Sequence, residues 1–375
     1  MRAPGGEGET WPRLRIGLVG PLPPPSGGMA NQTLQLAALL RAQGCEVELV
    51  QVNAPYRPGW VAPLKGVRAF CRLLPYLARL WRCAGRVQLL HVMANSGWSW
   101  HLFAAPAIWI GWLRGRPVVL NYRGGEADAF LARAAAWVRP SMARAAVVIV
   151  PSGYLEMVFG KYGVPCRVVP NIIDLARFAP APAPAPSRPA AITAPRILVA
   201  RHLEPIYDNA SALRAFALVL AHYPAASLVI AGDGPLRAAL EGLARELGVA
   251  GRVRFTGRLE NADMAALYRD ADLMLNPSTV DNMPNSVLEA LASALPVVST
   301  DVGGLPFLAR DGVSALLVPA ASPEAMAAAM LRLIRQPALA AALREAGLRQ
   351  VERYTWRAVR PVLLDVYRQA LDFMP

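Results

Sequence analysis

The sequence has little lysine and cysteine, and its apolar segments are short. Lysine occurs only at Lys65 and Lys161, so the net charge of +13 comes almost entirely from arginine. The four cysteines are too sparse for a disulfide scaffold and have no metal-binding spacing. The most apolar segment, residues 98–112, is shorter than a membrane span and contains His101 and Pro106. We expect that segment to form a buried or interfacial helix.

The first residues also lack the apolar core of a signal peptide. With so few cysteines, we therefore expect reduced thiols and a cytoplasmic protein that can associate peripherally with the inner face of the membrane.

Several motifs of common cofactors are absent. The loop at 20–28 is not the G-x-G-x-x-G fingerprint, which argues against NAD. No His or Cys–His pattern has metal-ligand spacing, and Asp270-Ala-Asp272 precedes a strand, so we interpret it as structural. No aromatic–basic module for nucleic acid is present. The positive charge therefore favours a nucleotide, a phosphate-bearing acceptor or a membrane surface.

Alternating strands and helices occur on both sides of a segment rich in proline and alanine. The first set opens with a strand at 14–19, a glycine loop, a helix at 29–43 and a strand at 46–52, which is a βαβ unit. A length of 375 residues suits two domains. We predict an α/β protein with a disordered lead at 1–12, Rossmann-like domains at 13–177 and 196–352, a linker at 178–195 and a final helix at 353–375.

A loop that leads into a helix stands out between residues 280 and 304. Ser286 is placed to cap this helix, and Glu289 follows in its first turn. A helix N-terminus attracts anions because its backbone N–H groups and its dipole face the incoming charge. Asp281 and Glu289 flank that anion site, and a carboxylate there can accept ribose hydroxyls. The alternative is a plain capping box, with Asp281 as a solvated loop acid.

The same stretch resembles the E-x(7)-E signature of retaining GT-B glycosyltransferases of family 4, with Asp281 in place of the first Glu. Segments 169–174, 231–235, 255–258 and 276–278 resemble the family in order and spacing. The resemblance implies two doubly wound, Rossmann-like domains with an active cleft between them, a nucleotide-diphosphate sugar donor and no metal ion. It implies that the first domain binds the acceptor, that the second binds the nucleotide sugar, and that the helix at 353–375 crosses back to the first domain. It implies catalytic roles for Arg201, Asp281 and Glu289. The donor-binding residues that it implies are Gly27, Gly28, Gly232, Gly234, Arg258, Met283, Asn285, Ser286 and Val287.

Two positions depart from the family pattern. Arg201 matches the family's arginine, but residues 204–209 hold no lysine where the family uses one to neutralise the diphosphate. Arg123 stands where many members carry a histidine, and a guanidinium cannot act as a general base because it stays protonated. It can instead hold a phosphate or a carboxylate-bearing acceptor. The residues that we expect to contact the acceptor or a phosphate are His91, Arg123 and Glu126.

The expected function is transfer of a sugar, with UDP as the favoured nucleotide, to a cell-surface polysaccharide or a lipid-linked glycan, with retention of configuration. Residues 62–87 mix arginines with apolar side chains at helical spacing, which is typical either of a helix on an anionic membrane or of a sheet-covering helix with a solvated face. Two alternative functions remain open: a nucleotide-sugar epimerase and a non-catalytic scaffold in a polysaccharide-assembly complex.

Overall fold

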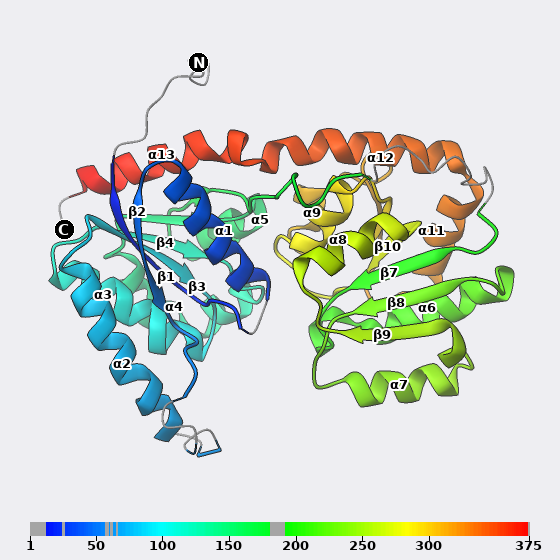
Figure 1. Ribbon diagram of the computed structural model, residues 1–375, viewed down its shortest axis with the longest axis horizontal. Helices are drawn as coiled ribbons and strands as arrows, with labels where there is room; N and C mark the ends of the chain where they lie inside the picture. Colours follow the sequence, from blue (N-terminus) through cyan, green and yellow to red (C-terminus); the bar gives the residue numbers. More distant parts are fainter. Residues whose placement is uncertain are drawn as a thin grey trace. The chain divides into compact units, whose positions relative to one another are not determined.

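The computed structural model describes residues 13–24, 27–56, 60, 63–64, 67–180 and 192–373, apart from the side chain of Arg68. Contacts divide the chain into two compact units (Figure 1). Unit 1 comprises Met1–Asn171 with Trp356–Pro375, and unit 2 comprises Ile172–Thr355. The expected lead at 1–12 and most of the expected linker lie outside the described residues. The contact boundaries fall at Asn171 and Thr355, a few residues from the sequence expectations of 177 and 353.

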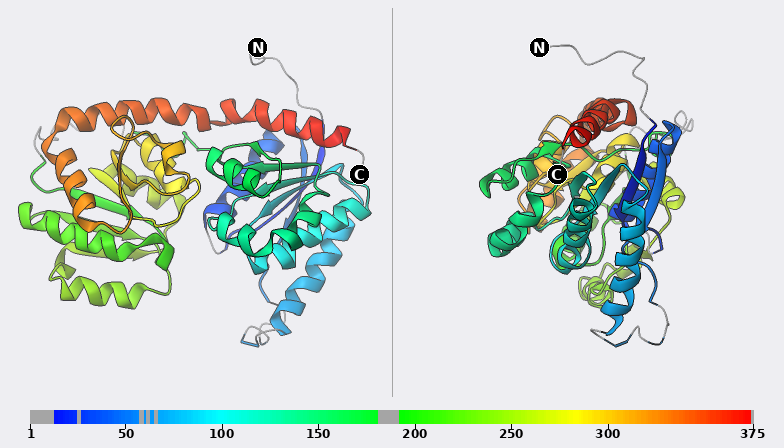
Figure 2. Two further views of the ribbon diagram at one scale, coloured as in Figure 1. Left: turned by 180° about the vertical axis from the view of Figure 1, so that it is seen from behind. Right: turned by 90° about the vertical axis from the view of Figure 1, so that its left-hand side faces the viewer.

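Unit 1 contains a six-stranded parallel sheet in the order β2-β1-β3-β4-β5-β6. Helices cover both of its faces (Figure 2). Its strands are β1 (Arg15–Gly20), β2 (Glu46–Gln51), β3 (Leu89–Ala94), β4 (Val118–Tyr122), β5 (Val147–Val150) and β6 (Arg167–Val168). Its α-helices are α1 (Gly28–Ala42), α2 (Val67–Ala84), α3 (Ala105–Leu113), α4 (Ala127–Met142), α5 (Gly153–Lys161) and α13 (Trp356–Asp372), and a π-helix at Trp100–Ala104 precedes α3.

Unit 2 contains a second six-stranded parallel sheet, in the order β12-β11-β10-β7-β8-β9. Its strands are β7 (Arg196–Ala200), β8 (Ser227–Ala231), β9 (Val253–Gly257), β10 (Leu273–Asn276), β11 (Val297–Thr300) and β12 (Leu316–Val318). Its α-helices are α6 (Asn209–His222), α7 (Arg237–Glu246), α8 (Asn261–Asp270), α9 (Asn285–Ala292), α10 (Leu305–Leu308), α11 (Pro323–Arg335) and α12 (Pro337–Val351). Both sheets confirm the predicted doubly wound α/β class.

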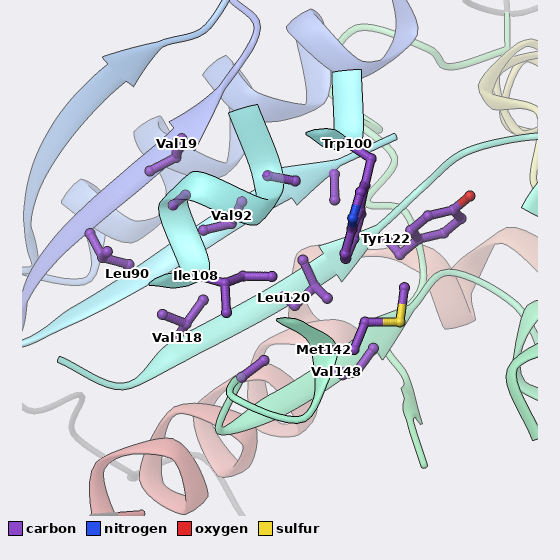
Figure 3. Close-up of a cluster of buried hydrophobic side chains, with 14 of the residues drawn as sticks. Val19, Leu90, Val92, Trp100, Ile108, Val118, Leu120, Tyr122, Met142 and Val148 are labelled. Atoms are coloured by element: carbon purple, nitrogen blue, oxygen red, sulfur yellow. The ribbon is translucent and has the colours of Figure 1, made fainter. Parts of the chain in front are cut away.

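The strands are rich in apolar residues because helices cover both faces of a parallel sheet, which buries the strand side chains on both sides. Every residue of β3 and β4 is buried. In unit 1, strand side chains such as Val92 and Leu120 meet Trp100, Ile108 and other helical residues in one apolar cluster (Figure 3). Burial of each such side chain stabilises the fold by about 1.5–3 kcal/mol. Unit 2 has two clusters of its own, so each unit has an independent core.

The strand orders place one topological switch point in each sheet. In unit 1 the chain runs from β1 to β2 and then returns to β3 on the other side of β1. In unit 2 it runs from β7 through β8 to β9 and returns to β10 on the other side of β7. Ligands of doubly wound sheets bind at the carboxyl ends of the strands beside such a switch. The ends of β1 and β3, and of β7 and β10, are therefore where functional residues belong.

Two segments that the sequence predicts to be helical are helical in the structure. The arginine-rich segment expected to be one kinked helix or two short ones is a single helix, α2, with Pro75 inside it. The apolar segment at 98–112 is helical, with Trp100 buried but Trp98 79% exposed. Among the described residues no single helix is long and apolar enough to cross a membrane, and only the bent pair formed by residues 323–335 and 337–372 meets that test by length and composition.

Candidate active site

A buried ion pair occupies the switch point of unit 2. Arg201 directly follows β7, and its Nε donates a hydrogen bond of 2.7 Å to Oδ1 of Asn276, the last residue of β10. Its Nη2 donates to the carboxylate of Asp281, and the two side chains are only 10% and 11% exposed. Asn276 is fully buried, and its Nδ2 donates to Ser299 Oγ at 2.9 Å. The strand order thus brings together two predicted catalytic residues that are far apart in sequence.

The ion pair has a consequence for the charge of this site. Burial raises the pKa of Asp281 above its ordinary value, and this effect outweighs the attraction of Arg201. Asp281 already balances the charge of Arg201. In the segment where the family's lysine was expected, Tyr207 places its ring 5.2 Å from the Arg201 guanidinium. That contact is a cation–π interaction and adds no positive charge.

The carboxylate of Glu289 projects from α9 towards α8. Its Oε2 accepts a hydrogen bond of 2.9 Å from the hydroxyl of Tyr268, which is 1% exposed. Burial raises the pKa of Glu289 to about 7, although Tyr268, Arg201 and Arg177 each lower it. A carboxyl group with this pKa exists in both protonation states near neutrality, and its second oxygen remains able to accept a hydroxyl proton.

The start of α9 differs from the sequence prediction. The N-cap is Pro284, with φ −67° and ψ 117°, and no side chain caps the helix. The prediction that Ser286 is the N-cap is wrong, because the fixed φ of proline lets the helix begin already at Asn285. The capping-box alternative for Glu289 is also wrong, since its carboxylate binds Tyr268. The hydroxyl of Ser286 is buried and has no hydrogen-bond partner within the described residues.

Two glycine loops hold this site in place. A Cβ on Gly304 would lie 1.6 Å from the carbonyl oxygen of Asn282, and the Gly304 N–H donates to Asp281 O at 2.9 Å. A Cβ on Gly232 would lie 2.0 Å from the carbonyl oxygen of Arg201, and one on Gly234 would lie 2.5 Å from that of Leu203. These glycines are needed because backbone approaches backbone directly behind Asp281 and Arg201.

The other predicted donor-binding residues are spread over several elements. Met283 and Val287 are 7% and 0% exposed and pack in a core cluster, so only their backbones can meet a ligand. Arg258 is exposed just beyond β9. In unit 1, Gly27 caps α1 and Gly28 begins it, and a Cβ on Gly27 would meet nothing within 4 Å. Among the described residues, a side chain at position 27 would therefore meet open space.

The expected acceptor residues of unit 1 behave differently from one another. His91 lies within β3, is fully buried and has both ring nitrogens in hydrogen bonds, to Tyr367 and Asn121. The prediction that His91 contacts a substrate is therefore wrong. Arg123 follows β4 and is partly buried. Glu126 is exposed and is the N-cap residue of α4, without a side-chain capping bond.

Sequence reasoning missed several partners of the predicted residues. Tyr268, Tyr207 and Tyr367 hold Glu289, Arg201 and His91 in turn. Tyr207 lies within the segment noted for its missing lysine, which was a usable signal. The sequence gives no indication that Tyr268 and Tyr367 have such partners, because a buried tyrosine at helical spacing is typical of any core. Within the described residues, no group of three His, Cys, Asp or Glu side chains could hold a metal ion.

Comparison with family models gives two matches. Residues 26–177 match the model described as Glycosyltransferase Family 4, and residues 194–336 match the one described as Glycosyl transferases group 1. The first match includes β2 to β6 of the first sheet, and the second includes all six strands of the second sheet.

Among curated proteins, the chain is 32% identical over 216 residues to a D-inositol 3-phosphate glycosyltransferase of Saccharomonospora viridis, covering 55% of this chain and 50% of the relative. The chain thus spans about half the length of the inositol-phosphate glycosyltransferases that it matches. It is 27% identical over 379 residues to a phosphatidyl-myo-inositol mannosyltransferase of Mycolicibacterium smegmatis, covering 94% and 93% of the two chains.

Two solved structures show the same fold. Sucrose-phosphate synthase of Thermosynechococcus elongatus superimposes with a TM-score of 0.73 at 22% identity, covering 95% of this chain and 99% of the other. The HepE protein of Anabaena in complex with UDP gives a TM-score of 0.73 at 17% identity, covering 95% and 100%.

Proposed function

The chain belongs to the GT-B glycosyltransferases of family 4, and on that premise we propose that it transfers a sugar from a nucleotide-diphosphate donor to a glycan acceptor. One observation carries the proposal: Arg201, Asp281 and Glu289 surround the switch point of unit 2, where a doubly wound sheet binds its ligand.

The donor chemistry follows from the charges at that switch point. As the glycosidic bond breaks, negative charge accumulates on the leaving diphosphate. Arg201 and the N-terminus of α9 would stabilise that charge, and Arg201 would exchange Asp281 for the diphosphate. The freed Asp281 would then accept hydroxyls of the sugar, while Glu289 would accept those of the ribose.

The stereochemical outcome is part of the proposal. The histidine expected at the acceptor side is not placed as a base, because His91 is buried in unit 1 and burial together with Arg123 lowers its pKa to about 3. Glu289 is assigned to the ribose in this proposal. A diphosphate that itself takes the acceptor proton fits such a site and leads to retention without a metal ion. Proton NMR of the anomeric coupling in the product tests this, and an inverted anomer contradicts it.

The acceptor class is a cell-surface polysaccharide or a lipid-linked glycan bound by unit 1. Relatives named for a phosphatidyl-inositol acceptor and for an inositol phosphate support an acceptor with a polar, ring-hydroxyl head. The HepE structure with UDP makes UDP the first nucleotide to test.

A membrane surface is the second partner that we propose. On α2, Phe70, Leu74 and Trp81 are 66%, 63% and 45% exposed, and their spacing places them on one side of the helix. Arg79 and Arg82 of the same helix are also exposed. At 3.6 residues per turn, Arg82 lies to one side of the apolar stripe and Arg79 lies on nearly the opposite side of the helix. A helix that exposes both an apolar stripe and arginines fits the boundary of an anionic lipid layer, and the protein would bind the inner face of the membrane peripherally.

One observation favours a second function, that of a non-catalytic scaffold. Arg201 is neutralised by Asp281, and Tyr207 lies in the segment where the family's lysine was expected, so the site offers a diphosphate less positive charge than the family pattern implies. A scaffold would bind nucleotide weakly or not at all.

A thermal-shift panel separates the two functions. UDP, GDP, ADP and their common sugars are added to the native protein, to Glu289→Ala and to Glu246→Ala, whose glutamate is exposed on α7. A donor that binds the folded state raises the melting temperature through mass action. We expect one nucleotide to stabilise the native protein and Glu246→Ala but not Glu289→Ala. A flat response at millimolar nucleotide favours the scaffold.

A further inference from the structure

Arg123 carries a partly buried positive charge that no carboxylate neutralises within the described residues. Its Nε donates to Asn121 Oδ1 at 3.1 Å, and its Nη1 donates to Asn171 Oδ1. Both partners are neutral amides. Nη2 makes no hydrogen bond with the described part of the chain. Burial lowers the pKa of Arg123 to about 10, with no acid group to offset it, so the guanidinium remains charged at neutral pH.

Such a charge is costly unless an anion meets it. A partly desolvated cation with unused N–H groups is stabilised most by a bidentate anion such as a phosphate or a carboxylate. Arg123 lies just beyond β4, and its backbone N–H donates to the oxygen of Ala94, the last residue of β3. It therefore stands at the carboxyl edge of the sheet, where ligands of this fold bind.

A chain of hydrogen bonds fixes the position of the guanidinium. Arg123 can only donate, so Oδ1 of Asn121 must face it and Nδ2 of Asn121 must face His91. His91 Nε2 therefore accepts, at 2.9 Å, and Nδ1 carries the hydrogen. That hydrogen is donated to the hydroxyl oxygen of Tyr367 on α13, also at 2.9 Å. His91, Asn121 and Tyr367 are each at most 1% exposed, so the chain is sheltered from water.

A cavity of about 240 Å³ opens at the same edge of the sheet. Apolar residues from β1, β3 and the neighbouring helices form most of its wall, and Asn53, Asn95 and Ser99 supply polar groups. No charged side chain lines it. Asn95 directly follows Ala94, to whose oxygen the backbone N–H of Arg123 donates, so the cavity and Arg123 lie at the ends of adjacent strands, although Arg123 itself does not line the cavity. A neutral part of a ligand suits the cavity, and its charge suits Arg123.

We propose that unit 1 takes an acceptor with an anionic group, phosphate or carboxylate, that Arg123 binds, and that His91 and Tyr367 are positioning residues for Arg123. The role as acceptor rests on the proposed function. The anion site itself rests only on the contacts of unit 1.

Ligand-observed NMR on the full chain tests the anion site with three matched probes: glycerol 3-phosphate, glycerate and glycerol. We expect one or both anions to bind and glycerol not to bind. Arg123→Gln should raise the dissociation constant of the anion by at least about tenfold, which corresponds to the loss of one charge-assisted hydrogen bond. Arg133→Gln, which removes an exposed arginine of α4, should leave binding unchanged. The anion with the lower dissociation constant identifies whether the acceptor group is a phosphate or a carboxylate.

The positioning role is tested by Tyr367→Phe, which removes only the hydroxyl. We expect it to raise the dissociation constant of the anion by about two- to fivefold, since one neutral hydrogen bond in the series that positions Arg123 is lost. UDP is titrated in the same samples, and its dissociation constant should not change. Arg123→Lys keeps the charge without the planar fork and should bind with intermediate strength, so the test does not depend on the folding of Arg123→Gln.

Several outcomes overturn the inference. The anion site is contradicted if no anion binds. It is also contradicted if the native protein, Arg123→Gln and Arg123→Lys bind the anion equally well. Equal anion binding by the native protein and Tyr367→Phe removes the positioning role. Failure of UDP to bind while the anion binds through Arg123 counts against the proposed function alone.

Discussion

Glu289 links protein stability to pH. Its pKa is about 7 in the folded protein and 4.5 when unperturbed, because burial disfavours the charged form. Below about pH 4.5 the group is protonated in both states. Between pH 4.5 and 7 the unfolded chain releases the proton while the folded chain retains it, so stability falls as the pH rises. Above about pH 7 the group is ionised in both states, so the loss of folding stability no longer changes with pH.

Glu289→Gln should remove this pH dependence. The amide stays neutral and can still accept from Tyr268, so we expect its melting temperature to exceed that of the native protein by about 2–6 °C at pH 8. Near pH 4.5 the difference should vanish. Calorimetry at both pH values measures it, with Glu246→Gln as the exposed control. Equal differences at pH 4.5 and pH 8 would show that Glu289 does not titrate as its burial implies.

In the proposed mechanism, Asp281 competes with the donor diphosphate for Arg201. Asp281→Asn should release the guanidinium and strengthen UDP binding by about three- to tenfold, because the anion no longer replaces a carboxylate. Sugar transfer should nevertheless fall, since the carboxylate that accepts sugar hydroxyls is lost. Calorimetric titration and a transfer assay measure the two effects, and Asp263→Asn on α8 is an exposed control. Weaker UDP binding would mean that Asp281 supports the site instead of competing for it.

At the scale of elements, the loop before α10 holds Asp281 through direct backbone contact. Gly304 has φ −85°, which any residue can adopt, so the obstacle to a side chain is steric: the Cβ would collide with the backbone of Asn282. Gly304→Ala should destabilise the protein by about 2 kcal/mol, as overpacking does, and should abolish stabilisation by nucleotide. Gly251→Ala is the matched control because its Cβ meets nothing within 4 Å. Equal free energies of unfolding for the two variants would contradict this role of Gly304.

The helix α2 provides the second test at this scale. If its exposed stripe lies on an anionic membrane, Arg79→Glu with Arg82→Glu should reduce sedimentation with phosphatidylglycerol vesicles by about tenfold or more, since each charge near the surface is worth about 1 kcal/mol. The control is Arg252→Glu with Arg254→Glu, two exposed arginines of unit 2. Unchanged binding of the α2 variant would rule out this surface. Vesicles of phosphatidylcholine should bind neither protein.

At the scale of the whole molecule, both units are built on a doubly wound parallel sheet. Each winds a parallel sheet outward and then back, which leaves a switch point, and each places its unusual charged residues there or beside it. The charged residue of unit 2, Arg201, has a carboxylate partner, and that of unit 1, Arg123, has two amides. Under the two proposals above, this difference would distinguish a donor site, where an anion must replace Asp281, from a subsite where Arg123 can bind an anion directly.

The sequence by itself determined the alternation of strands and helices, the two-domain organisation and the stretch around Asp281 and Glu289. These follow from local patterns, since helical and strand periodicities and turn residues are readable within a few positions. It misplaced the cap of α9 because proline and serine are both good signals there, and the backbone decides between them.

Only the tertiary structure decided which side chains meet. Arg201 finds Asp281 because β7 and β10 are neighbours, and His91 is hidden because Tyr367 of α13 covers it. These pairs are separated by 80 and 276 positions in the chain. Their contact depends on strand order and on the return of the last helix to the first sheet, and neither property leaves a trace in local periodicity.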